Sequence, residues 1–112
     1  MDVIKEKLLD NLKGVEGTLI YQLHENNEID IDNMNEFYEM SKSIIKGIVN
    51  ETVDPKTVAV LYSNYTLIWK YFAFHFDKKD SYFITNLTSD LYSEIADELE
   101  YIFDVKKVGL VG

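Results

Sequence analysis

The sequence predicts a single α/β domain with the element order αββαβββα, and the spacing of its apolar residues is the first reason. Apolar residues recur at helical spacing in residues 3–13, 34–50 and 90–103. Gly14 directly follows the first of these segments, where a glycine commonly ends a helix. Asp32 or Asn33 can cap the second segment and Asp90 the third, because short polar side chains accept hydrogen bonds from free N–H groups of the first turn. These three segments are the expected helices.

Five other runs have the composition or the alternation of strands, which is the second reason. They cover residues 18–23, 28–31, 57–63, 66–76 and 82–87. Most are rich in β-branched and aromatic residues, which favour strands. Turn-forming polar residues separate the runs at residues 25–27, at Asn64 and at residues 77–80. We therefore expect a five-stranded, mostly antiparallel sheet whose last three strands form a meander.

Length and composition favour one domain. The 112 residues, 46% of them hydrophobic, suffice for one compact core, which we expect over residues 1–104 with a short tail over residues 105–112. No apolar run reaches the roughly 20 residues of a membrane span, and the first residues lack the apolar segment of an export signal. The chain has no cysteine, so nothing indicates an oxidising compartment. The expected location is the cytoplasm.

Charge and residue types exclude several classes of function. The net charge of −9 repels nucleic acids and anionic lipids, so neither a nucleic acid nor a membrane is an expected partner. All basic residues are lysines, which excludes an arginine finger supplied by this chain. The two histidines, His24 and His75, show no ligand spacing, and no glycine-rich phosphate loop is present. We expect no enzyme activity, no cofactor and no metal.

The predicted helix over residues 34–50 has an unusually wide apolar surface. On a helical wheel its apolar side covers ~180°, whereas one core-facing stripe needs only ~100°. One interpretation is that a thick aromatic sheet covers more of this helix than usual. The other is that part of the apolar side contacts a second copy of the chain, because Met and aromatic residues are enriched in interface cores.

An exposed edge strand would favour the second interpretation, because an unpaired edge invites association. The strand expected over residues 57–63 is such an edge. The predicted self-association surface consists of Phe37, Met40, Ser41, Ile44, Ile48, Val58, Val60 and Tyr62. On this interpretation Ile44→Glu should give a folded monomer, whereas unfolding would place the helix in the core.

Short motifs resemble the roadblock, or dynein light chain roadblock, family. They are LLDNLKGVEGTLIY at residues 8–21 and TNLTSDLYSEIADEL at residues 85–99, together with the helix and strand order. The segment EIDID at residues 28–32 differs, because the family has a glycine-containing turn and a more apolar strand there. The resemblance implies a sheet with helices one and three on one face and helix two on the other. It also implies homodimers that pair through the second helix and third strand, and non-catalytic scaffolds or regulators of small GTPases and motor complexes.

The helix expected over residues 90–103 is strongly acidic. Glu94, Asp97, Glu98 and Glu100 form a candidate acidic surface that would steer a basic partner, although such a run is also typical of a solvated helix face. We predict a non-catalytic homodimeric protein-interaction module of roadblock type, with a small GTPase or another protein subunit as partner. A small-ligand sensor domain is the alternative, and a hydrolase ranks third because no convergent polar groups are evident.

Overall fold

The computed structural model describes residues 2–104, which form five helices and no strand. The helices are α1 Asp2–Lys13, α2 Leu19–Glu25, α3 Ile31–Val49, α4 Pro55–Phe76 and α5 Ser89–Ile102. The prediction of an α/β domain with a five-stranded sheet is therefore wrong. Helices do occupy the three segments that were expected to be helical. The predicted tail over residues 105–112 lies outside the described residues.

Four of the five described helices begin at a residue whose side chain caps the first turn. Thr18, Asp30, Asp54 and Thr88 are the N-caps of α2, α3, α4 and α5, and each side chain accepts a hydrogen bond from the backbone N–H three residues later. Such caps satisfy one of the free donors of the first turn. Pro55 follows the cap of α4, where its fixed φ angle and missing N–H suit the helix start. Local sequence thus sets these four boundaries, although the caps of α3 and α5 precede the residues expected to cap them.

Two predicted strands, over residues 57–63 and 66–76, are instead parts of the single helix α4. The buried residues of α4 are Thr57, Leu61, Asn64, Ile68 and Phe72. Their separations of three or four residues match the helical period, so one stripe faces the core. Burial of this stripe outweighs the strand preference of the β-branched and aromatic residues, because propensity differences are small compared with packing.

The other three predicted strands also have different structures. Residues 18–23 contribute the N-cap and most of α2, and residues 28–31 cover the end of the α2–α3 connection and the first residue of α3. Residues 82–87 form a loop that is fastened to this connection. The side-chain amide of Asn86 both accepts from Ile29 N and donates to Ile29 O, each at 2.8 Å, and Thr85 N donates to Asn27 O at 2.7 Å. Hydrogen bonds between two loops therefore replace the expected sheet.

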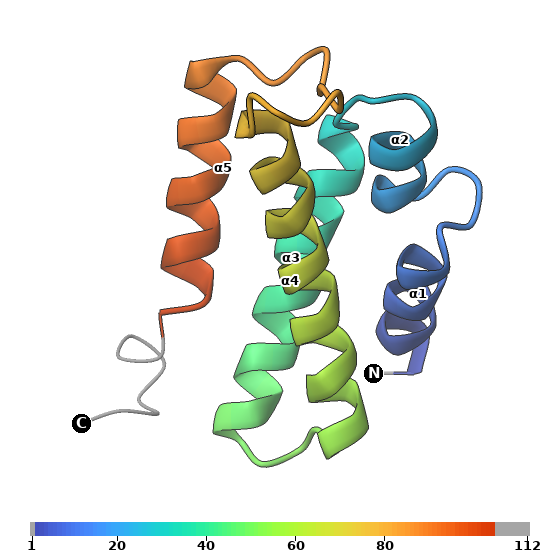
Figure 1. Ribbon diagram of the computed structural model, residues 1–112. Coiled ribbons are helices and arrows are strands. Elements are labelled where there is room, and N and C mark those ends of the chain that lie inside the picture. The colour runs from blue at the N-terminus through green and yellow to red at the C-terminus, as the bar shows by residue number, and fades with distance from the viewer. Residues whose placement is uncertain (1, 105–112) are drawn as a thin grey trace.

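The arrangement is centred on the antiparallel pair α3 and α4 (Figure 1). Helix α1 packs against α4 and also contacts α2, while α5 packs against α3 on the opposite side. All five helices contribute to one apolar core, in which Leu8, Ile20, Ile44, Ile68 and Leu99 are buried. Because α3 has neighbours on more than one side, its wide apolar surface is used mainly within the chain.

A buried pair of asparagines joins three helices. Asn11 of α1 donates through Nδ2 to Asn64 Oδ1 of α4, and its Oδ1 accepts from Ile20 N of α2 at 2.9 Å. Asn64 Nδ2 donates to Leu8 O at 3.1 Å and to Val60 O at 2.8 Å. Within the described residues no buried side-chain polar atom lacks a partner. The asparagine pair thus fixes α1 and α2 relative to α4.

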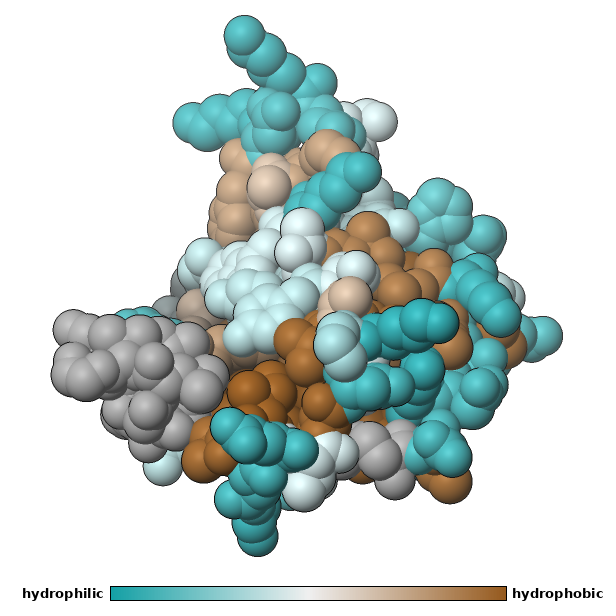
Figure 2. Space-filling view, turned by 90° about the horizontal axis from the view of Figure 1, so that it is seen from below, coloured by the Kyte–Doolittle hydropathy of each residue, from teal (hydrophilic) through white to brown (hydrophobic). Residues whose placement is uncertain are grey.

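The end of the molecule that carries the α3–α4 connection shows apolar residues at the surface. Seen from this end, hydrophobic residues form a band below and to the right of a paler central area, and hydrophilic side chains project around them (Figure 2). Val49, the last residue of α3, is exposed. Exposed apolar residues are therefore not confined to one site.

The α3–α4 connection packs closely over a glycine of α3, Gly47. A Cβ atom on Gly47 would lie 2.1 Å from Val53 Cγ2 and 3.2 Å from Thr52 Oγ1. Thr52 N donates to Gly47 O at 2.8 Å, so the connection folds back directly over this position.

We expect Gly47→Ala to reduce the free energy of unfolding by about 1–3 kcal/mol, the usual cost of overpacking, although alanine favours helix by about 1 kcal/mol. Urea denaturation followed by circular dichroism measures this. In a Val53→Ala background the clash with Cγ2 is removed, and Gly47→Ala should become neutral or stabilising. An equal loss of stability in both backgrounds would contradict this account of Gly47.

Candidate protein-binding groove

Helices α3 and α5 pack together in a way that leaves a groove between them, with a volume of about 410 Å³. The groove is lined by Ile31, Met34, Asn35, Tyr38, Glu39, Lys42, Leu91, Glu94, Ile95 and Glu98. On each helix these residues recur at intervals of three or four, so each helix presents one face to the groove. The groove is thus a product of two amphipathic helices lying side by side.

The floor of the groove is apolar. Met34 and Ile95 are almost completely buried, and Leu91 is half-buried. Ile31, at the first position of α3, is 45% exposed. An apolar group that enters the groove can therefore bury the exposed apolar surface of Ile31.

The walls of the groove are acidic. Glu39 extends from α3, and Glu94 and Glu98 extend from α5. Among residues 2–104, Lys42 is the one basic residue that lines the groove, so three carboxylates of these residues face one ammonium group. Lys42 Nζ lies 3.2 Å from Glu39 Oε1 and 3.6 Å from Glu98 Oε1. The hydrogen bond with Glu39 is the largest reason why the pKa of Lys42 is raised.

Tyr38 adds a hydroxyl group to the groove. Burial is the main cause that raises its pKa to about 12, and the negative charges of Glu98 and Glu94 raise it further. The phenol therefore stays protonated at neutral pH and can donate a hydrogen bond. An anionic ligand would meet the same negative field that disfavours ionisation of this tyrosine, so the groove suits a cationic one.

The predicted acidic surface divides into two parts. Glu94 and Glu98 line the groove, whereas Asp97 and Glu100 are exposed on α5 outside it. The sequence also did not reveal the α3 wall, formed by Tyr38, Glu39 and Lys42. The i, i+3 pair of Glu39 and Lys42 is visible in the sequence, but its position opposite α5 depends on tertiary packing.

The predicted self-association surface is not assembled as expected. Phe37, Ser41 and Ile44 are 0–1% exposed and belong to the core of the chain itself. Met40, Ile48, Val58 and Val60 are half-buried, and Tyr62 is 37% exposed on α4. No edge strand exists among residues 2–104, because residues 57–63 are helical. Of the two interpretations of the wide apolar helix, the described core supports burial within the chain, against helices instead of a sheet.

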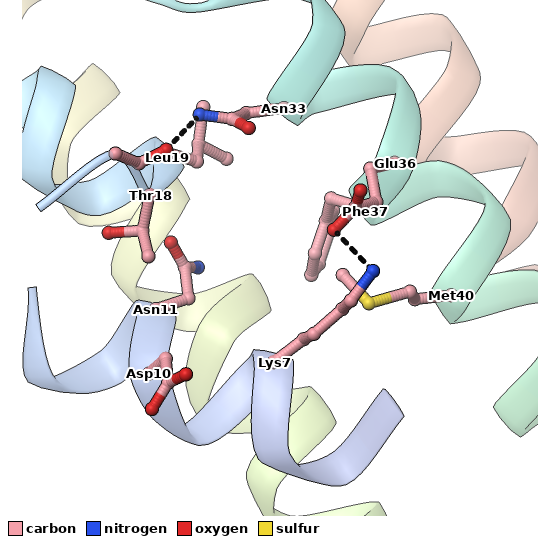
Figure 3. A pocket seen from close by; sticks show the side chains of 10 residues that line it. Lys7, Asp10, Asn11, Thr18, Leu19, Asn33, Glu36, Phe37 and Met40 are labelled. Atoms are coloured by element: carbon pink, nitrogen blue, oxygen red, sulfur yellow. Dashed lines mark hydrogen bonds and ion pairs between the residues drawn. The ribbon is translucent and has the colours of Figure 1, made fainter. Parts of the chain in front are cut away.

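A second, smaller cleft lies between α1, α3 and the start of α2 (Figure 3). Its volume is about 140 Å³, and Phe37 and Leu19 contribute apolar lining. Lys7 of α1 reaches toward Glu36 of α3, with Nζ and Oε1 3.6 Å apart, and Asn33 Nδ2 donates to Gly17 O at 2.8 Å. Sites for small ligands usually have about 300–1,000 Å³, so this cleft is a poor fit for a sensor domain.

Both histidines make structural contacts. His75 Nδ1 accepts a hydrogen bond from Ile84 N at 2.9 Å, and burial lowers the pKa of His75. His24 Nδ1 lies 3.2 Å from the Tyr71 hydroxyl oxygen. Over residues 2–104 there is no group of three or more His, Cys, Asp or Glu side chains that could hold a metal ion. In the same part of the chain no helix is long and apolar enough to cross a membrane.

Comparisons with protein-family models, with curated proteins and with solved structures find no match to this chain. The roadblock resemblance implies a five-stranded sheet, which the described residues do not form. The interface that it implies, a helix beside an edge strand, is therefore absent from residues 2–104.

Proposed function

We propose that this protein is a non-catalytic protein-interaction module whose α3–α5 groove binds a basic helical segment of a partner protein. The observation that carries this proposal is the combination of an apolar floor with three carboxylates on the walls of one groove of about 410 Å³. An apolar floor favours a partner with apolar anchors. The carboxylates favour lysine or arginine beside those anchors.

A helix is the segment that fits best, because an amphipathic helix places its apolar residues into a groove at intervals of three or four residues. The α5 wall extends from Leu91 to Glu98, which at about 1.5 Å per residue is roughly 10 Å, or two turns. The net charge of −9 adds a long-range attraction for a basic partner. Weakening of this attraction by salt is therefore expected.

This function does not depend on the roadblock fold. A small GTPase or another protein subunit remains a candidate partner when it carries a basic helical segment, and we propose the cytoplasm as the compartment. Self-association also remains a proposal. It would have to use exposed residues such as Tyr62 instead of Phe37, Ser41 and Ile44, which lie in the core.

The test uses a fluorescein-labelled, 18-residue amphipathic peptide composed of leucine and lysine as the probe. Fluorescence anisotropy at about 0.05 M salt should show binding, and neutralisation of the groove by Glu94→Gln with Glu98→Gln should weaken it about tenfold. The matched control is Asp97→Asn with Glu100→Gln, which removes the same charge from the same helix outside the groove. This control should change affinity by no more than about twofold, because neither Asp97 nor Glu100 lines the groove and neither carboxylate contacts a peptide bound there.

Three outcomes would contradict the proposal. The first is no binding of the leucine–lysine peptide to the unaltered protein. The second is equal weakening by the two double variants, which would mean that the peptide responds only to total charge. The third is binding of a leucine–glutamate peptide, in which glutamate replaces every lysine, to the unaltered protein with an affinity similar to that of the leucine–lysine peptide.

A further inference from the structure

Lys42 occupies a special position in the groove, because its ammonium group bridges the two walls. Glu39 lies one turn before it on α3, and Glu98 lies opposite on α5. No other basic side chain of the described part of the chain lines the groove. The point between Glu39 and Glu98 is therefore where a cation is best stabilised, and the chain's own cation is already there.

We propose that Lys42 is a built-in competitor, which a lysine or arginine of the partner must displace from between Glu39 and Glu98. This inference rests on the proposed function of the groove. Lys42 then has a regulatory role, because it lowers the affinity of the groove for basic segments. Only a segment whose cation reaches the position between Glu39 and Glu98 displaces it. Without Lys42 the same groove binds basic segments more tightly.

The geometry makes displacement feasible. The side chain of Lys42 is 45% exposed, and those of Glu39 and Glu98 are 74% and 38% exposed. Exposed ion pairs contribute little to stability, because water and salt screen them and the side chains lose entropy. The four-carbon stem of lysine can also rotate its ammonium group into solvent. Lys42 therefore competes for the acidic position without closing the groove permanently.

An incoming cation has two advantages over Lys42. It is anchored by the apolar residues of its own helix on the groove floor, near Ile31 and Leu91. An arginine would also bring a planar group that can form two parallel hydrogen bonds with one carboxylate. A segment with apolar anchors but no cation makes the contacts with the groove floor but none with the carboxylates, so Lys42 stays in place and the two glutamates remain paired within the chain.

The test compares Lys42→Met with Lys46→Met, using the same leucine–lysine peptide. Lys46 lies one turn further along α3, is exposed and does not line the groove, so its substitution removes the same charge. Lys42→Met should bind the peptide on the order of fivefold more tightly than the unaltered protein, the effect of losing a pair of weak competing contacts. Lys46→Met should change affinity by less than about twofold. Lys42→Gln should reproduce the gain, which excludes an effect of the larger apolar surface of methionine.

An equal gain for Lys42→Met and Lys46→Met would overturn the inference, because it would show a general charge effect. Unchanged or weaker binding by Lys42→Met would overturn it as well, and a simultaneous drop in thermal stability would identify Lys42 as a link that holds α5 on α3. These results differ from failure of the proposed function. In that case the unaltered protein does not bind the peptide, or the variants that neutralise Glu94 and Glu98 bind it as well as the unaltered protein does.

Discussion

Ile44→Glu is expected to unfold the protein, not to produce a folded monomer. Ile44 is 0% exposed and lies in the middle of α3, inside the single apolar core. A carboxylate there would lose its hydration without gaining a partner, because Ile44 lies among apolar core residues and the buried side-chain polar atoms of the described residues are already paired. The cost is on the order of 5 kcal/mol or more, which is comparable with the whole stability of a typical domain.

Two control variants separate burial from other effects of the substitution. Ile44→Val keeps an apolar side chain and should cost about 0.5–1.5 kcal/mol. Ser43→Glu places the same carboxylate one residue earlier on the exposed side of α3 and should change stability by no more than about 0.5 kcal/mol. Circular dichroism and size-exclusion chromatography measure all three variants. A cooperatively folded, monomeric Ile44→Glu would show that α3 does not belong to the core.

The second large effect is expected for Asn64→Ala. The substitution removes three hydrogen bonds at a position that is 0% exposed, and it leaves Asn11 Nδ2 without its acceptor. Loss of a buried partner and loss of packed volume together should reduce the free energy of unfolding by about 2–4 kcal/mol. Urea denaturation at 25 °C measures this change.

A double-mutant cycle with Asn11→Ala tests whether the two asparagines act as a pair. Each single variant leaves the other amide unsatisfied, so the double variant should cost at least about 1 kcal/mol less than the sum of the two. Full recovery is not expected, because Ile20 N would still lose its acceptor, Asn11 Oδ1. Additive costs would show that the two side chains stabilise the fold independently.

Sequence patterns identified some helices and missed others for definable reasons. Segments with apolar spacing near 3.6 residues are helical, as predicted for α1, α3 and α5. Helix α4 was mistaken for two strands because its exposed side also carries aromatic and β-branched residues, such as Tyr62 and Phe74, which hide the helical period. The sequence around Asn64 predicts a turn between two strands. The side chain of Asn64 instead supplies buried hydrogen bonds inside α4, which only its position opposite Asn11 makes favourable.

The candidate site also combines residues that the sequence points to with residues that only the tertiary structure brings there. The acidic character of α5 follows directly from its sequence, and it is sufficient to single out Glu94 and Glu98 as candidate binding residues. The groove could not be predicted, because it depends on α3 lying beside α5 and on the positions of Glu39 and Lys42 relative to Glu98. The buried state of Phe37 and Ile44 also depends on which helices surround α3.

By itself, the sequence determined the net charge, the absence of cysteine and arginine, the helical character of α1, α3 and α5, and the acidic face of α5. These are properties of composition or of contacts between residues close in the chain. Only the tertiary structure decided that residues 55–76 form a helix, that Ile44 is core and that an acidic groove opens beside α3. The physical reason is that burial depends on partners far away in the sequence, and its free energy exceeds the small local preferences that distinguish helix from strand.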